Sequence, residues 1–78
     1  MIKDDLLLEK LKYYDNDAII KLIDHHINGR NAERNRKILK RRFIDGIYYE
    51  PLAEEFDLSV RQVQNIVYSA IKKFLIIL

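Results

Sequence analysis

The sequence contains no cysteine, a single proline and only two glycines in 78 residues, and each scarcity excludes a class of structure. Without cysteine the chain has neither a disulfide framework nor a thiolate metal site, and nothing indicates an oxidising compartment. Two isolated glycines cannot form the glycine-rich loop that holds a nucleotide phosphate. We therefore expect a cytoplasmic protein of one domain, residues 1–78, with modest stability because its core is small.

Long apolar runs are also missing. The run at residues 6–8 is too short for an export signal, and acidic residues stand where such a signal carries basic ones. The final FLIIL is much shorter than the roughly 20 apolar residues that span a bilayer. The sequence thus predicts a soluble protein without a membrane partner.

Positive charge, by contrast, is concentrated in one place. Residues 30–45 hold 7 of the 14 Lys and Arg residues and 2 acids, a net charge of +5. Residues 1–29 hold 4 basic and 6 acidic residues, and residues 46–78 hold 3 and 4. Although the whole chain has a net charge of only +2, a basic segment of this length favours an anionic partner such as nucleic acid.

Apolar residues recur every three or four positions, and no run alternates with the period of a strand. We expect an all-α, compact bundle of about five helices. A pair of helices occupies residues 1–29, over residues 3–14 and from a cap at Asp15 or Asn16 to about residue 27. Further helices are expected at residues 32–45, 49–56 and 60–76, with Asn31 capping the first of these three.

The last two predicted helices have the spacing of a helix-turn-helix. Ala53 is small enough for two helices to cross there, and Asp57 can adopt the left-handed backbone of the turn. Ser59 and Gln62 form a capping box, so the final helix should begin sharply after Ser59. The apolar residues that would close the corner are Leu52, Phe56, Leu58, Val63 and Ile66. A helical corner without DNA-binding function would need the same residues.

Evidence for DNA binding comes from the outward face of the last helix. Arg pairs with guanine, and Gln or Asn with adenine, in the major groove. The base-reading candidates, with Ser59 at the helix start, are Ser59, Val60, Arg61, Gln64, Asn65 and Tyr68.

The segment Lys37 to Phe74, about half of the chain, resembles region 4 of bacterial sigma factors and related small helix-turn-helix proteins of phages and mobile elements. The resemblance is carried by Arg42, Phe43, Gly46, Tyr49, Glu50, Ala53, Glu54, Glu55, Phe56, Asp57, Leu58, Ser59, Val63, Ile66, Ala70, Lys72 and Lys73. It implies a recognition helix, about residues 59–75, in the major groove of double-stranded DNA, and it makes RNA polymerase a candidate partner. It also implies phosphate contacts from the basic helix, Tyr49 and the lysine pair, namely Arg34, Lys37, Lys40, Arg41, Tyr49, Lys72 and Lys73.

The sequence also departs from that family. Primary sigma factors have Arg-Glu-Arg where this chain has Val60, Arg61 and Gln62, so their promoter sequence does not carry over. We expect something other than a complete sigma factor, because 78 residues leave no room for the domain that binds the polymerase core. Tyr48 stands where Thr or Ser usually caps the fourth helix, which predicts a slightly distorted helix start.

No residue cluster indicates catalysis, a cofactor or a metal. Adjacent histidines point about 100° apart on a helix, so His25 and His26 should not share a metal; we expect His25 exposed and His26 half-buried. The pairs Tyr13/Tyr14 and Tyr48/Tyr49 should each place one ring in the core and one on the surface.

The carboxyl-terminal apolar end suggests a second kind of surface. Ile71, Phe74, Leu75 and Leu78 continue the inward stripe, whereas Ile76 and Ile77 face elsewhere and could be covered in a homodimer. Two functions therefore stay open: a small DNA-binding transcriptional regulator of a bacterium or phage, or a sigma-like adaptor that binds polymerase or another host factor instead of DNA.

Overall fold

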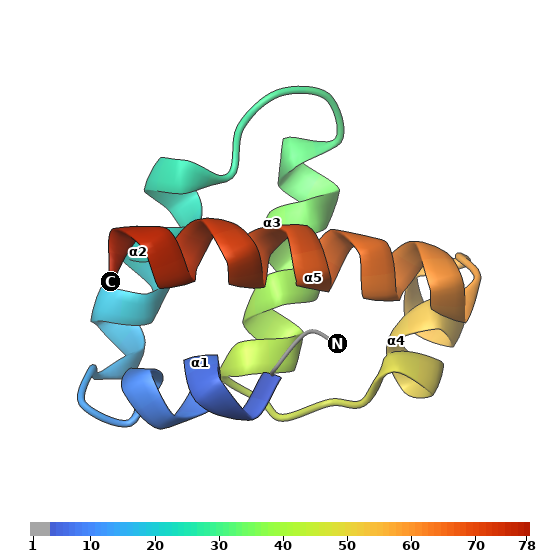
Figure 1. The fold of residues 1–78 in the computed structure, drawn as a ribbon. Helices are drawn as coiled ribbons and strands as arrows, with labels where there is room; N and C mark the ends of the chain where they lie inside the picture. Colours follow the sequence, from blue (N-terminus) through green and yellow to red (C-terminus); the bar gives the residue numbers. More distant parts are fainter. Residues whose placement is uncertain (1–3) are drawn as a thin grey trace.

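The computed structural model describes residues 4–78, with side chains from residue 6 onward, and this part of the chain forms five α-helices and no strand (Figure 1). They are α1 (Asp4–Leu11), α2 (Asn16–His26), α3 (Ala32–Phe43), α4 (Tyr49–Phe56) and α5 (Val60–Ile77). The predicted all-α bundle is confirmed. The bounds of α4 match the prediction, and α5 ends one residue later than predicted. None of these helices is long and apolar enough to cross a membrane.

α1 ends three residues earlier than its apolar pattern predicts. After Leu11, the amides of Tyr13 and Tyr14 donate to carbonyl oxygens three residues back, which tightens the chain into a turn. Tyr13 is 90% exposed and Tyr14 44% exposed, so the expectation of one core ring in this pair is wrong. The Tyr48/Tyr49 pair does divide into an exposed and a half-buried ring. Lys3, the predicted start of the first helix, lies outside the described residues.

The helix starts show which local signals act as expected. Asp15 caps α2, because its Oδ1 accepts a hydrogen bond of 2.8 Å from the amide of Ala18. Asn31 precedes α3 but makes no side-chain cap, so that prediction is wrong. Its backbone is left-handed (φ 63°), whereas a capping side chain needs an extended backbone to reach the first-turn amides. α3 also ends at Phe43, two residues before the predicted end.

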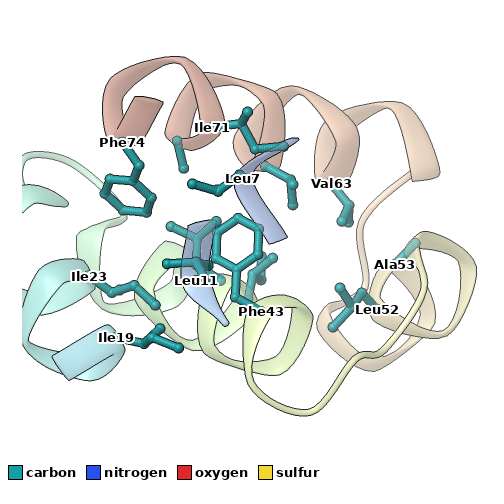
Figure 2. Packing of buried hydrophobic residues seen from close by; sticks show 14 residues of the cluster. Leu7, Leu11, Ile19, Ile23, Phe43, Leu52, Ala53, Val63, Ile71 and Phe74 are labelled. Atoms are coloured by element: carbon teal, nitrogen blue, oxygen red, sulfur yellow. The ribbon is translucent and has the colours of Figure 1, made fainter. Parts of the chain in front are cut away.

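All five helices contribute side chains to one core (Figure 2). α5 packs against α1, α3 and α4, and α2 packs on α3. Phe74 of α5 and Phe43 of α3 meet edge to face, with ring centroids 6.3 Å apart. The buried apolar residues are Leu7, Leu11, Ile19, Ile23, Ile38, Leu39, Phe43, Leu52, Ala53, Val63, Val67, Ala70, Ile71 and Phe74. The helix expected to read DNA is therefore also the helix around which the core is built.

Candidate nucleic-acid interface

The turn between α4 and α5 has the expected backbone. Asp57 adopts the left-handed conformation (φ 55°, ψ 47°), and its amide donates to the last carbonyl oxygens of α4. The amide of Leu58 donates back to the Ala53 oxygen at 2.9 Å, which closes the helix end. Three residues thus connect the two helices without a glycine.

The start of α5 is held by a capping box. The Ser59 hydroxyl accepts from the Gln62 amide at 3.1 Å, and the Gln62 side chain accepts from the Ser59 amide at 2.9 Å. Two of the free amides at the helix start are thereby satisfied. The same bonds fix the first turn of α5, in which Arg61 lies between the two bonded residues.

The corner between α4 and α5 is packed as a helix-turn-helix requires. Ala53 is 5% exposed, and Leu52 and Val63 are fully buried. Phe56, Leu58 and Ile66 are partly buried against the same core. Either function needs this packing, so it supports the helix-turn-helix geometry and nothing further.

One line of polar side chains runs along the outside of α5; we call Arg61, Asn65, Ser69 and Lys72 the outer ridge. Their spacings of four, four and three residues place them on one face of a helix, and all four are exposed. None of the four side chains makes a hydrogen bond or ion pair with another described residue, so all four are available to a partner.

The other predicted base-reading residues lie elsewhere. Val60 is partly buried against the core, and the Ser59 hydroxyl is occupied by the cap. Gln64 and Tyr68 are half-buried on one flank of α5. The ring of Tyr68 meets that of Tyr49 edge to face at 6.0 Å. Of the six candidates, the structure brings Arg61 and Asn65 onto the outer ridge.

The basic helix α3 is less free than its sequence suggests. Lys40 pairs with Asp24 of α2 at 2.8 Å, and Lys37 pairs with Glu33 at 3.7 Å. Arg34 donates to the side-chain oxygen of its neighbour Asn35. Of the four basic phosphate candidates on α3, only Lys37 is exposed, and the other three are half-buried.

Arg41 connects α3 to α4. Two of its nitrogens donate to one carboxylate oxygen of Glu55, at 3.2 and 2.9 Å, and a third donates to Asp45 at 3.0 Å. These bonds, first to Glu55 and then to Asp45, raise the pKa of the Arg41 guanidinium above its ordinary value. The side chain stays charged, and the carboxylates of Glu55 and Asp45 largely compensate its charge.

The remaining phosphate candidates differ among themselves. Lys72 is exposed and has no partner among the described residues. Lys73 donates to the backbone oxygen of His26 at 2.9 Å and ties the carboxyl-terminal part of α5 to the end of α2. Tyr49 is half-buried, with the guanidinium of the buried Arg42 5.3 Å from its ring centre. Lys72 is therefore the most available of the three.

Two exposed polar residues escaped the sequence prediction. Ser69 follows Asn65 by four residues and precedes Lys72 by three, and this spacing could have placed it on the outer ridge. Arg30 lies exposed in the α2–α3 connection. Among the described residues no group of three or more His, Asp or Glu side chains could hold a metal, and His25 is exposed and His26 half-buried as expected.

The outer face of α4 is acidic. Glu50, Glu54 and Glu55 surround Pro51 in a shallow surface depression, and all four residues are exposed. Only Glu55 is engaged, by Arg41. A polyanion that approaches α5 from this side would meet like charge.

Comparison with known proteins adds no relative. No protein-family model, no curated protein and no solved structure matches this chain.

Proposed function

We propose that this protein binds duplex DNA through α5 and acts as a small transcriptional regulator of a bacterium or phage. The outer ridge is the observation that carries the proposal, because it presents four exposed polar side chains without internal partners. The major groove of DNA admits an α-helix. The capped start of α5 and its packing against α4 would hold the ridge at a fixed angle to the rest of the domain.

The chemistry of the ridge suits base reading and backbone contact together. Arg61 can pair with guanine, and Asn65 with adenine. Lys72 lies eleven residues after Arg61, about 16 Å along the helix axis at 1.5 Å per residue. It would contact a phosphate at the edge of the groove. Gln64 and Tyr68 flank the ridge and would extend the contact on one side.

Free positive charge is limited, which shapes the expected affinity. Since Lys40 and Arg41 already face carboxylates, the cations left for phosphate are chiefly Arg61 and Lys72, together with Lys37, whose ion pair with Glu33 is long at 3.7 Å and exposed, and Arg30 in the α2–α3 connection. Each phosphate contact contributes about one unit of salt slope. We expect weak binding by one copy and a shallow dependence on salt.

A homodimer would raise that affinity. The carboxyl-terminal end exposes Ile76 (86%) and Ile77 (43%). Nearby, Leu6, Tyr13, Tyr14 and Leu78 line a shallow depression beside the end of α1. Two copies joined through this end would read two half-sites, roughly 34 Å apart if they lie one helical turn from each other. Sedimentation of the protein with and without residues 75–78 tests the dimer.

The decisive experiment is a selection of bound sequences from random duplexes, followed by affinity measurement at several salt concentrations. We expect an enriched motif, and weaker binding of it by the Arg61→Ala, Lys37→Ala double variant. Lys21→Ala, an exposed lysine on α2, is the matched control and should bind like the parent protein. Binding that is undetectable at low salt, or that ignores the double substitution, would refute the proposal.

The alternative function is a sigma-like adaptor that binds RNA polymerase or another host protein. The acidic outer face of α4 favours it, since Glu50 and Glu54 would repel DNA but could pair with a basic protein surface. Glu50→Gln with Glu54→Gln separates the two functions. The double variant should strengthen duplex binding if α5 reads DNA, and should weaken capture of polymerase if α4 is the docking face.

A further inference from the structure

A groove of about 340 Å³ lies where the segment that follows α2, the middle of α3 and α5 meet. In Figure 1, α5 crosses both α2 and α3, and the connection at residues 27–31 joins those two helices on one side of the crossing. This volume is at the lower end of what small-molecule sites occupy. It opens beside the outer ridge, because Asn65 and Ser69 line it.

The groove has an apolar floor and a polar rim. Leu39 and Ala70 are buried and Ile66 is half-buried, and together they form the floor. The rim carries side chains that donate hydrogen bonds, and no carboxylate is among the described residues that line it. An apolar base with a few convergent polar groups is the usual build of a ligand site.

Several donors on the rim have no partner. The oxygen of Asn35 is taken by Arg34, at 3.1 and 2.9 Å, which leaves its Nδ2 group free. The side chain of Asn65 makes no hydrogen bond to a described residue. Lys73 uses one of its three N–H groups for the His26 oxygen.

One basic side chain lines the groove, and two more contact residues that line it. Lys73 lines it directly. Two arginines hold lining residues in place, Arg34 through Asn35 and Arg36 through Asn28 at 3.0 Å. Arg36 also donates to the Ile27 backbone oxygen at 2.7 Å. Three cations without a lining carboxylate favour an anion, and the apolar floor favours one that carries a ring.

We propose that this groove binds a nucleoside monophosphate or an organic anion of the same build. Its phosphate would lie at Lys73 and its ring on Leu39, Ile66 and Ala70. The polar edge of the ring would meet the carboxamides of Asn35 and Asn65. Asn65 and Lys73 are eight residues apart on α5, about 12 Å along the axis, a length that a mononucleotide spans from phosphate to base edge.

Such a ligand would regulate the outer ridge. A carboxamide of Asn65 engaged in the groove is unavailable to adenine in the major groove. This consequence rests on the proposed DNA binding, whereas ligand binding itself does not. The ligand is therefore expected to lower duplex affinity, and ligand binding can be measured in the absence of DNA.

The test is a titration of isotope-labelled protein, followed by NMR, with adenosine 5′-monophosphate, adenosine and inorganic phosphate as probes. We expect saturable shifts at Asn35, Ile66 and Ser69 with the nucleotide. Adenosine and phosphate should each bind at least about tenfold more weakly, because each lacks either the charged hydrogen bonds or the apolar contact. Equal binding of adenosine, or of phosphate alone, would overturn the proposal.

Two variants with matched controls complete the test. Asn35→Asp keeps the acceptor for Arg34 but replaces the free donor by a negative oxygen, and should weaken nucleotide binding about tenfold or more. Asn16→Asp adds the same charge at the far end of α2 and should have no effect. Lys73→Gln should weaken nucleotide binding as Asn35→Asp does, with Lys21→Gln as its control. Because Lys73 also donates to the His26 oxygen, Lys73→Gln can destabilise the fold. If it unfolds, the Asn35→Asp variant is the one that tests the proposal.

Where the nucleotide binds is equally informative. Shifts centred on Arg61 and Lys72 would mean that it occupies the outer ridge, and would refute the groove. If the nucleotide binds the groove while no duplex binds α5, the DNA proposal fails and the ligand site stands. The opposite result would leave DNA binding intact and remove the ligand site.

Discussion

Helices α3 and α5 both bury one face in the same core, yet their outer faces differ. α3 carries six of the 14 Lys and Arg residues of the sequence, more than any other helix, and three of the six form ion pairs with Asp24, Glu33, Asp45 and Glu55. The outer ridge of α5 carries only Arg61 and Lys72 as cations, and both are free of internal partners. The number of cations in a helix therefore does not measure the charge that it offers to a partner.

The largest expected effect concerns the face that the two helices share. Phe43→Ala in α3 or Phe74→Ala in α5 should each lower the free energy of unfolding by about 3–5 kcal/mol, because the two rings touch inside one core. A domain of this size has only about 4–12 kcal/mol in total, so the double variant should not fold. Denaturant titration followed by circular dichroism measures this. A loss below about 1 kcal/mol for either ring would contradict a shared core.

The second prediction compares the outer faces of α5 and α3. Arg61→Ala with Lys72→Ala should weaken duplex binding about tenfold or more, since a base-reading arginine alone is worth about 1–3 kcal/mol. Lys40→Gln with Arg41→Gln removes the same charge from α3 and should weaken it far less, because those cations face carboxylates. Fluorescence anisotropy with the selected duplex measures both. Equal losses would show that charge number, not availability, sets affinity.

A third prediction separates a structural serine from a ridge serine on the same helix. Ser59→Ala removes the cap of α5 and should destabilise the protein by about 1 kcal/mol. Ser69→Ala makes the same chemical change on the outer ridge and should shift stability by less than about 0.5 kcal/mol. Thermal or denaturant unfolding compares the two variants. A similar loss in both would argue that the capping box contributes nothing.

The smallest effect is the ion pair between α2 and α3. A double-mutant cycle of Asp24→Ala and Lys40→Ala should give a coupling of about 0.5 kcal/mol, because both side chains are partly exposed. The pair Glu33 and Lys37 is longer, at 3.7 Å, and more exposed, so its coupling should be smaller. The two cycles are measured by denaturation at low and high salt. A larger coupling for the second pair would reverse the expected order.

The sequence predicted what depends on neighbours along the chain. The bounds of α4, the capping box of Ser59 and Gln62 and the left-handed Asp57 all rest on residues within one or two helical turns, and the structure confirms them. Asn31 shows the limit of such reasoning, since a left-handed backbone removed the expected cap. The DNA-binding role and its residues stay predictions.

What the sequence could not show depends on distant partners. Arg41 and Glu55 are 14 residues apart, and Lys73 and His26 are 47 apart, so only the fold reveals that these cations are engaged. The groove has the same origin, because its walls come from α3, α5 and the connection between α2 and α3. Periodicity indicates which side of a helix faces inward, but not which residues of another helix meet it there.

The central place of α5 has a consequence for how the domain is made. α5 follows the other four helices along the chain, so the ribosome delivers it after all of them. Until it emerges, α1 lacks the helix against which it packs and α4 has only α3 as a partner, so much of the apolar surface of the first four helices stays exposed. The domain should therefore fold in one late step after synthesis of its last helix, and a product truncated before Val60 should be degraded rather than accumulate as a partial fold.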